Sequence, residues 1–104
     1  MYTIGLIGCG RISFKHVEGY LKNSDKLVMV AACDPRVERA QAKADEYTKG
    51  SPGALVKVYA DYRAMLAELR PDIVTIATES GYHPRIAIDC LEAGCHVIDR
   101  KSVV

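Results

Sequence analysis

The stretch that decides the fold of this chain is YTIGLIGCGRIS, residues 2–13. It opens with aliphatic and β-branched residues, which predict a buried strand over residues 2–8. A helical period begins at Ile12 and continues to Lys22. A glycine-rich turn between a strand and a helix is typical of a phosphate-binding site, because the start of the helix offers N–H groups and a positive dipole end.

The turn itself reads GCGRIS, residues 8–13, and matches G-x-G-x-x-G with Ser13 at the third glycine position. Gly8 permits the tight turn out of the strand, and Gly10 removes a Cβ where a pyrophosphate approaches the backbone. The third position must be small so that helix and strand pack closely, and serine is nearly small enough. The predicted cofactor contacts in this segment are Gly8, Gly10, Arg11 and Ile12.

A carboxylate, Asp34, follows the second predicted strand at about the separation that the dinucleotide-binding fingerprint requires. It can accept hydrogen bonds from both ribose hydroxyls of an adenosine, and it repels a 2′-phosphate. We therefore expect NAD as the cofactor, with NADP less favoured. Arg36, two residues on, is a further predicted contact that weakens this preference. The alternative is that the glycines are ordinary turn residues and Asp34 is a cap before Pro35.

The rest of the chain alternates apolar runs with helical periods. Because the apolar runs are continuous, both faces of the sheet should be covered by helices. Residues 1–104 are therefore predicted to form one α/β domain, a doubly wound parallel Rossmann sheet of about five strands in the order 3-2-1-4-5. The further strands are expected over residues 27–33, 56–59, 73–77 and 95–98, and helices over 12–22, 36–47, from an Asp61 cap to Pro71, and from Pro84 to a Gly94 C-cap, with a loop over 49–53.

Helical spacing also predicts which side chains each helix buries. In chain order they are Ser13, Val17, Tyr20 and Leu21; Val37, Ala40, Ala44 and Tyr47; Tyr62, Met65, Leu66 and Leu69; and Ile86, Ala87, Cys90 and Leu91.

Composition excludes several classes of protein. Fourteen Lys and Arg against 13 Asp and Glu give a net charge of +1, so neither nucleic acid nor a membrane surface is an expected partner. No apolar run reaches membrane-spanning length. The N-terminal residues MYTI have no basic region ahead of the apolar run and no small-residue cleavage pattern, so we expect no signal peptide and a cytoplasmic location. The four cysteines show no CxxC or zinc spacing. We expect buried, unpaired thiols and no metal site.

Together these motifs resemble the N-terminal domain of the glucose–fructose oxidoreductase and inositol dehydrogenase family over essentially the whole chain. The resemblance implies an NAD(P)-dependent oxidoreductase acting on sugars, cyclitols or sugar nucleotides, with a second domain that carries most substrate contacts and mediates oligomerisation. The matching stretches are residues 4–13 with His16, residues 32–35, 59–62, 72–78 and 91–97.

The resemblance also implies two motifs near the nicotinamide. The first is usually Thr-Pro-x-x-x-His, and here Thr78 and His83 match while Glu79 replaces the proline. The form SGYH, residues 80–83, resembles members that oxidise UDP-linked amino sugars. Glu79 and His83 are alternatively read as a polar loop that caps a helix.

The second motif is usually Glu-Lys-Pro, and here only Lys101 matches. A lysine at this place can donate to the reacting oxygen and stabilise its charge, so Lys101 is the candidate catalytic residue. Arg100 replaces the acid and Ser102 the proline, which leaves a solvated terminal lysine as the alternative.

The resemblance further leads us to expect that the second domain is absent from these 104 residues and that the chain is truncated relative to the family. The leading hypothesis is the cofactor domain of an NAD-dependent, sugar-type oxidoreductase. The alternatives are a non-catalytic nucleotide-binding fragment that binds without turnover, and a fragment that self-associates through the edge of its last strand.

Overall fold

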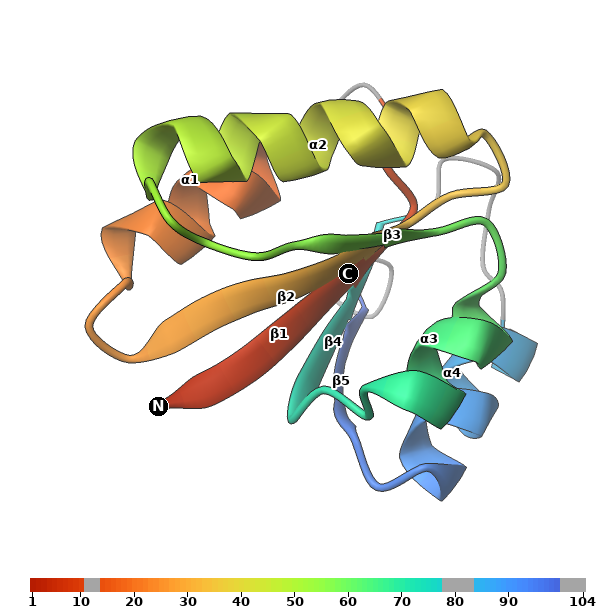
Figure 1. The fold of residues 1–104 in the computed structure, drawn as a ribbon. Coiled ribbons are helices and arrows are strands. Elements are labelled where there is room, and N and C mark those ends of the chain that lie inside the picture. Colours follow the sequence, from red (N-terminus) through yellow and green to blue (C-terminus); the bar gives the residue numbers. More distant parts are fainter. Residues whose placement is uncertain (11–13, 78–83, 100–104) are drawn as a thin grey trace.

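A computed structural model of the chain describes residues 1–10, 14–77 and 84–99. Strands and helices alternate along these residues, as Figure 1 shows. The strands are β1 (Tyr2–Ile7), β2 (Leu27–Cys33), β3 (Lys57–Tyr59), β4 (Ile73–Ile76) and β5 (His96–Asp99). The helices are α1 (Phe14–Lys22), α2 (Val37–Gly50), α3 (Tyr62–Glu68) and α4 (Pro84–Glu92).

The five strands form one sheet in the order β3-β2-β1-β4-β5, and every neighbouring pair is parallel. The predicted fold class and strand order are thereby confirmed. β1 lies at the centre, where Ile7 pairs with Cys33 of β2 on one side and with Ile76 of β4 on the other. This register brings the carboxyl ends of β1, β2 and β4 together at one edge.

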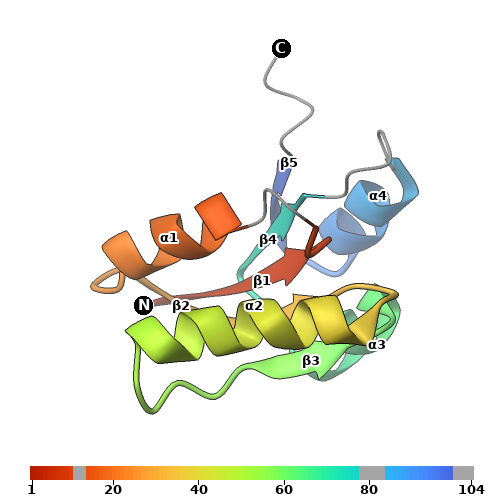
Figure 2. The same cartoon turned by 90° about the horizontal axis from the view of Figure 1, so that it is seen from above.

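Helices cover both faces of the sheet. Figures 1 and 2 show α1 and α2 on one face and α3 and α4 on the other. Each pair of helices closes its own apolar core, because successive strand residues point to opposite faces. The α1–α2 core is built around Leu6, Met29 and Tyr47, and the α3–α4 core around Ile7, Met65 and Val74. Continuous apolar strands predicted this two-sided burial.

Local capping signals act where the sequence predicted them. The Asp61 side chain accepts a hydrogen bond from the Arg63 N–H at 2.9 Å and caps α3. Pro84 is the first residue of α4. Beyond the end of α4, Gly94 has a φ of +90°, a conformation in which a Cβ is disfavoured. These caps fix where α3 and α4 begin or end.

Three sequence predictions need correction. α2 continues to Gly50 rather than ending at Tyr47, and the Thr48 hydroxyl donates to the Ala44 carbonyl within the extra turn. Val37 is exposed because it lies in the first turn of α2, ahead of the buried Ala40. Leu91 is exposed because it lies about 100° around α4 from the buried Cys90.

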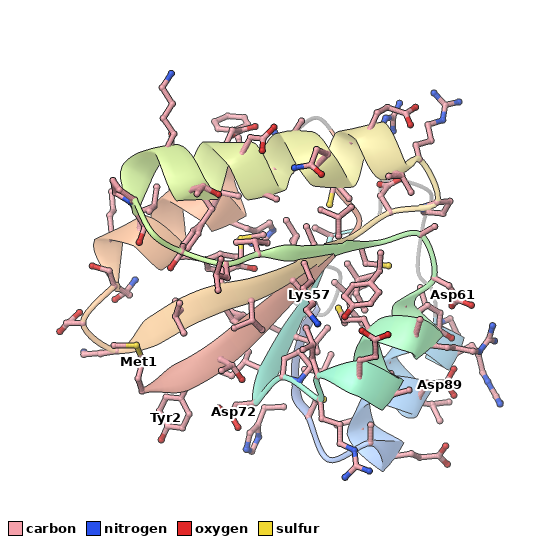
Figure 3. All side chains as sticks on the ribbon, in the orientation of Figure 1. Met1, Tyr2, Lys57, Asp61, Asp72 and Asp89 are labelled. Atoms are coloured by element: carbon pink, nitrogen blue, oxygen red, sulfur yellow. The ribbon has the colours of Figure 1, made fainter. Side chains whose placement is uncertain are left out.

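Hydrogen bonds between Thr3 and Asp72 join the amino ends of β1 and β4. The Thr3 N–H donates to Asp72 Oδ2 at 2.9 Å, and the Asp72 N–H donates to Thr3 Oγ1 at 2.9 Å. Figure 3 shows Asp72 near Tyr2 at this edge, with Asp61 toward the other end of the sheet. Ligands of such sheets bind at the opposite edge, where the strands have their carboxyl ends.

Candidate functional site

A pocket of about 670 Å³ opens at the carboxyl edge, where β1 and β2 end. This is the size of a small-molecule site. It lies where the chain turns out of both strands, which is the position at which open α/β sheets bind ligands. Its lining residues are Ile7, Gly8, Gly10, Cys33, Asp34, Pro35, Arg36, Arg39, Ala60, Asp61, Tyr62, Arg63 and Ile86.

The glycine turn forms one wall of the pocket. Gly8 has a φ of +92°, a backbone conformation that glycine adopts without the penalty that a Cβ brings. Its N–H donates to the Cys33 carbonyl at 2.8 Å, which ties the turn to the end of β2. The backbone at Gly8 therefore makes the tight turn out of β1 for which the sequence predicted a glycine.

Asp34 joins the turn to the loop after β2. Its Oδ2 accepts from the Cys9 N–H at 2.8 Å, and its Oδ1 accepts from the Arg36 N–H at 2.8 Å. Its exposed fraction is 8%. The carboxylate thus lies in the floor of the pocket, and each of its oxygens already accepts one backbone hydrogen bond. Each oxygen can accept a second, so both remain able to receive a ribose hydroxyl.

The pocket's charge balance suits an anionic ligand. Arg36, Arg39 and Arg63 line it, against the carboxylates of Asp34 and Asp61. Both carboxylates accept backbone N–H groups, so part of their negative charge is already compensated. Three guanidinium groups against two carboxylates favour phosphate-bearing molecules.

The wall opposite the glycine turn comes from the start of α3. Tyr62 and Arg63 lie there, with the Arg63 guanidinium 5.2 Å from the centre of the Tyr62 ring. The Tyr62 hydroxyl donates to the Asp89 carboxylate on α4, which also pairs with Arg85 at 3.3 Å. These contacts hold Tyr62 of α3 against α4. No site role was predicted for these residues, because no pattern in the sequence marks the packing of α3 against α4.

Cys9 occupies the middle of the turn but is not a nucleophile. Its Sγ donates to the Cys33 carbonyl at 3.4 Å, and the side chain is buried. Burial, followed by the negative charge of Asp34, raises the pKa of the Cys9 thiol to about 12, so it stays protonated at neutral pH. All four cysteines are free and buried, as predicted from the sequence.

These thiols make stability sensitive to alkali. Burial raises the pKa of Cys9, Cys33 and Cys90 to about 12, from an ordinary value of 9.0. Between pH 9 and 12 the unfolded chain releases protons that the folded chain retains, so the free energy of unfolding falls as pH rises. We expect a slope of up to about 1.4 kcal/mol per pH unit for each thiol. Urea unfolding of wild type and Cys90→Ala across this range measures it, and an unchanged slope in the variant contradicts the prediction.

The structure brings four of the predicted contacts, Gly8, Gly10, Asp34 and Arg36, around one pocket. The other predicted site residues, Arg11, Ile12, Thr78, His83 and Lys101, lie outside the described residues. Within the described residues, no group of three or more His, Cys, Asp or Glu side chains could hold a metal ion. None of the described helices has the length and apolar character needed to cross a membrane.

A doubly wound parallel sheet with a glycine turn after β1 and a carboxylate at the end of β2 defines a dinucleotide-binding Rossmann domain. The family model described as "Oxidoreductase family, NAD-binding Rossmann fold" matches residues 2–101. The chain therefore belongs to the Gfo/Idh/MocA oxidoreductase family, as its sequence resemblance predicted.

Several family members are similar over most of this chain. D-glucoside 3-dehydrogenase of Escherichia coli strain K12 is 35% identical over 98 residues, which are 94% of this chain and 26% of the relative. The WlbA dehydrogenase of Bordetella pertussis, solved with NADH and UDP-GlcNAcA, superposes with a TM-score of 0.81 at 33% identity, covering 94% of this chain and 28% of that one. The scyllo-inositol dehydrogenase of Lactobacillus casei, solved with NAD(H) and scyllo-inositol, gives 0.74 at 25%, covering 95% and 27%. The chain thus spans about a quarter of these relatives.

Proposed function

We propose that residues 1–104 are the dinucleotide-binding domain of an NAD-dependent oxidoreductase that acts on a sugar, cyclitol or sugar nucleotide. The observation that carries the proposal is the pocket in which Gly8, Asp34 and Arg36 meet. The residues fit the adenosine end of a dinucleotide, because a positive-φ glycine, a carboxylate floor and an arginine-rich rim lie together. When bound, the nicotinamide would carry the hydride.

Each site residue has a distinct proposed role. The N–H groups of Gly8 and Cys9 bind Cys33 and Asp34 within the protein. On the basis of the sequence motif, the pyrophosphate is proposed to lie against the segment of Gly10, Arg11 and Ile12. Asp34 and Arg36 face the adenosine ribose. The residues proposed on the basis of family resemblance are Thr78 and His83 beside the nicotinamide and Lys101 as the catalytic donor to the reacting oxygen.

NAD rather than NADP is the proposed cofactor. The carboxylate of Asp34 lies in the pocket floor, where it would repel a 2′-phosphate. NADH bound to a family member that is 33% identical supports the same choice. The substrate class is proposed from relatives whose names give a D-glucoside, UDP-GlcNAcA and scyllo-inositol. A cytoplasmic location is carried into the proposal as an expectation.

Titration of the purified chain with NADH and NADPH, followed by nicotinamide fluorescence, tests the cofactor. We expect saturable NADH binding, about tenfold or more tighter than NADPH, because like charges placed side by side are costly. Lack of NADH binding at millimolar concentration contradicts the proposal. NADPH binding as tight as NADH overturns the cofactor preference alone.

A narrower alternative is that these 104 residues bind the dinucleotide without turning over a substrate, since relatives that share the domain are about four times as long. The chain is mixed with NAD⁺ and either UDP-GlcNAcA or a D-glucoside, and NADH formation is followed by absorbance. Binding without NADH formation supports the alternative, whereas measurable turnover refutes it. Self-association through the exposed edge of β5 is checked by sedimentation in the same samples.

A further inference from the structure

Asp34 makes two backbone contacts that do not involve a ligand. Its Oδ2 receives the Cys9 N–H from the turn after β1, and its Oδ1 receives the Arg36 N–H from the start of α2, each at 2.8 Å. Both contacts are short, charge-assisted hydrogen bonds, and the residue is buried. One side chain therefore bridges the two segments between which the pocket opens.

Two neighbouring hydrogen bonds do not involve the Asp34 side chain. The Gly8 N–H binds the Cys33 carbonyl at 2.8 Å, and the Asp34 N–H binds the Tyr59 carbonyl at 3.0 Å. These are backbone contacts that remain when the Asp34 side chain is changed. The Cys9 and Arg36 amides thus report on the carboxylate, while the Gly8 amide reports on the backbone pairing between the ends of β1 and β2.

We infer that Asp34 is a positioning residue that holds the glycine turn and the start of α2 in the binding conformation before a dinucleotide arrives. The inference rests on the proposed function and gives Asp34 a role beyond contact with the ribose. A residue that only discriminated between ribose and its 2′-phosphate would, when shortened, relieve repulsion and improve NADP binding. Loss of a residue that also holds the turn costs both cofactors affinity, since both share the pyrophosphate, and for NADP this cost offsets the relief of repulsion.

The first test uses the protein without any ligand. Amide hydrogen exchange is measured by NMR for wild type, Asp34→Ser and Asp45→Asn. Asp45 is the matched control, because it is an exposed acid on α2 that accepts from the Gln41 side chain. We expect the Cys9 and Arg36 amides to be protected in wild type and to exchange about tenfold faster in Asp34→Ser. The Gly8 amide and the control variant should be unchanged.

The second test compares affinities. Asp34→Ser and Asp34→Asn are expected to bind NADH at least about tenfold more weakly than wild type, because serine does not replace both acceptors and asparagine presents an NH₂ group to one of the two backbone N–H groups. NADPH should gain no affinity in either variant, because the loss of the held turn offsets the relief of repulsion on the 2′-phosphate. Tighter NADPH binding by Asp34→Ser, with Cys9 still protected, overturns the inference.

The two proposals fail in different ways. If wild type binds neither nucleotide, the proposed function is lost, while amide exchange still decides the role of Asp34. If the Asp34 variants do not fold, the free wild-type chain decides: a protected Cys9 amide supports positioning, and exchange at the rate of an unstructured peptide overturns it.

Discussion

Replacing Gly8 by alanine is expected to weaken NADH binding about thirtyfold. At a φ of +92°, a residue with a Cβ is strained by about 1–3 kcal/mol. The turn escapes this strain by leaving the conformation that the pocket requires. A strain of about 2 kcal/mol lowers the population of the competent turn about thirtyfold, and the apparent affinity falls by the same factor. Fluorescence titration with NADH measures the loss.

Gly53 supplies a matched control. It has the same φ of +92°, it lies between α2 and β3, and a Cβ added there meets nothing within 4 Å. Gly53→Ala should therefore carry similar backbone strain and a similar cost in stability, but bind NADH as wild type does. Equal losses of affinity in both variants would show that general destabilisation, and not the turn after β1, controls binding. Unchanged affinity in Gly8→Ala also contradicts the prediction.

The fold was predictable because its signals are local and repeat along the chain. Continuous apolar runs separated by helical periods led to a parallel sheet covered on both faces, and the handedness of the crossovers limited the strand order. Capping signals are equally local, so the Asp61 cap and Gly94 stop were found. The end of α2 was missed because residues 49–53 have a loop-forming composition, whereas the helix continues to Gly50. Composition does not decide where a packed helix frays.

The site was predictable only on the side built by β1 and β2. Gly8 and Asp34 follow consecutive strands, and parallel pairing of those strands places them at one edge. The opposite wall depends on where α3 and α4 pack. The Tyr62–Asp89 hydrogen bond joins residues 27 apart in sequence, and no periodicity marks it. Arg63 joins the pocket through the same packing.

Tyr47→Ala is expected to lower the free energy of unfolding by about 3–5 kcal/mol, the range for removing a buried aromatic ring. Tyr47 is 1% exposed and packs in the α1–α2 core. Total stability for a domain of this size is about 5–15 kcal/mol, so this loss is a large fraction of it. Urea unfolding measures the change, and the thermal midpoint should drop by about 15 °C or more.

Tyr2→Ala is the matched control, because it removes the same side chain from a site that is 60% exposed. Its expected cost is about 0.5 kcal/mol, and an equal loss in both variants would show that α2 is not held by Tyr47. The cofactor should act differently on Tyr47→Ala and on Gly8→Ala. α2 carries Arg39 on the pocket wall, so NADH at 100 times its Kd should return about 2.7 kcal/mol to Tyr47→Ala. Gly8→Ala, tested at that same NADH concentration, should recover far less, because its defect lies in binding itself.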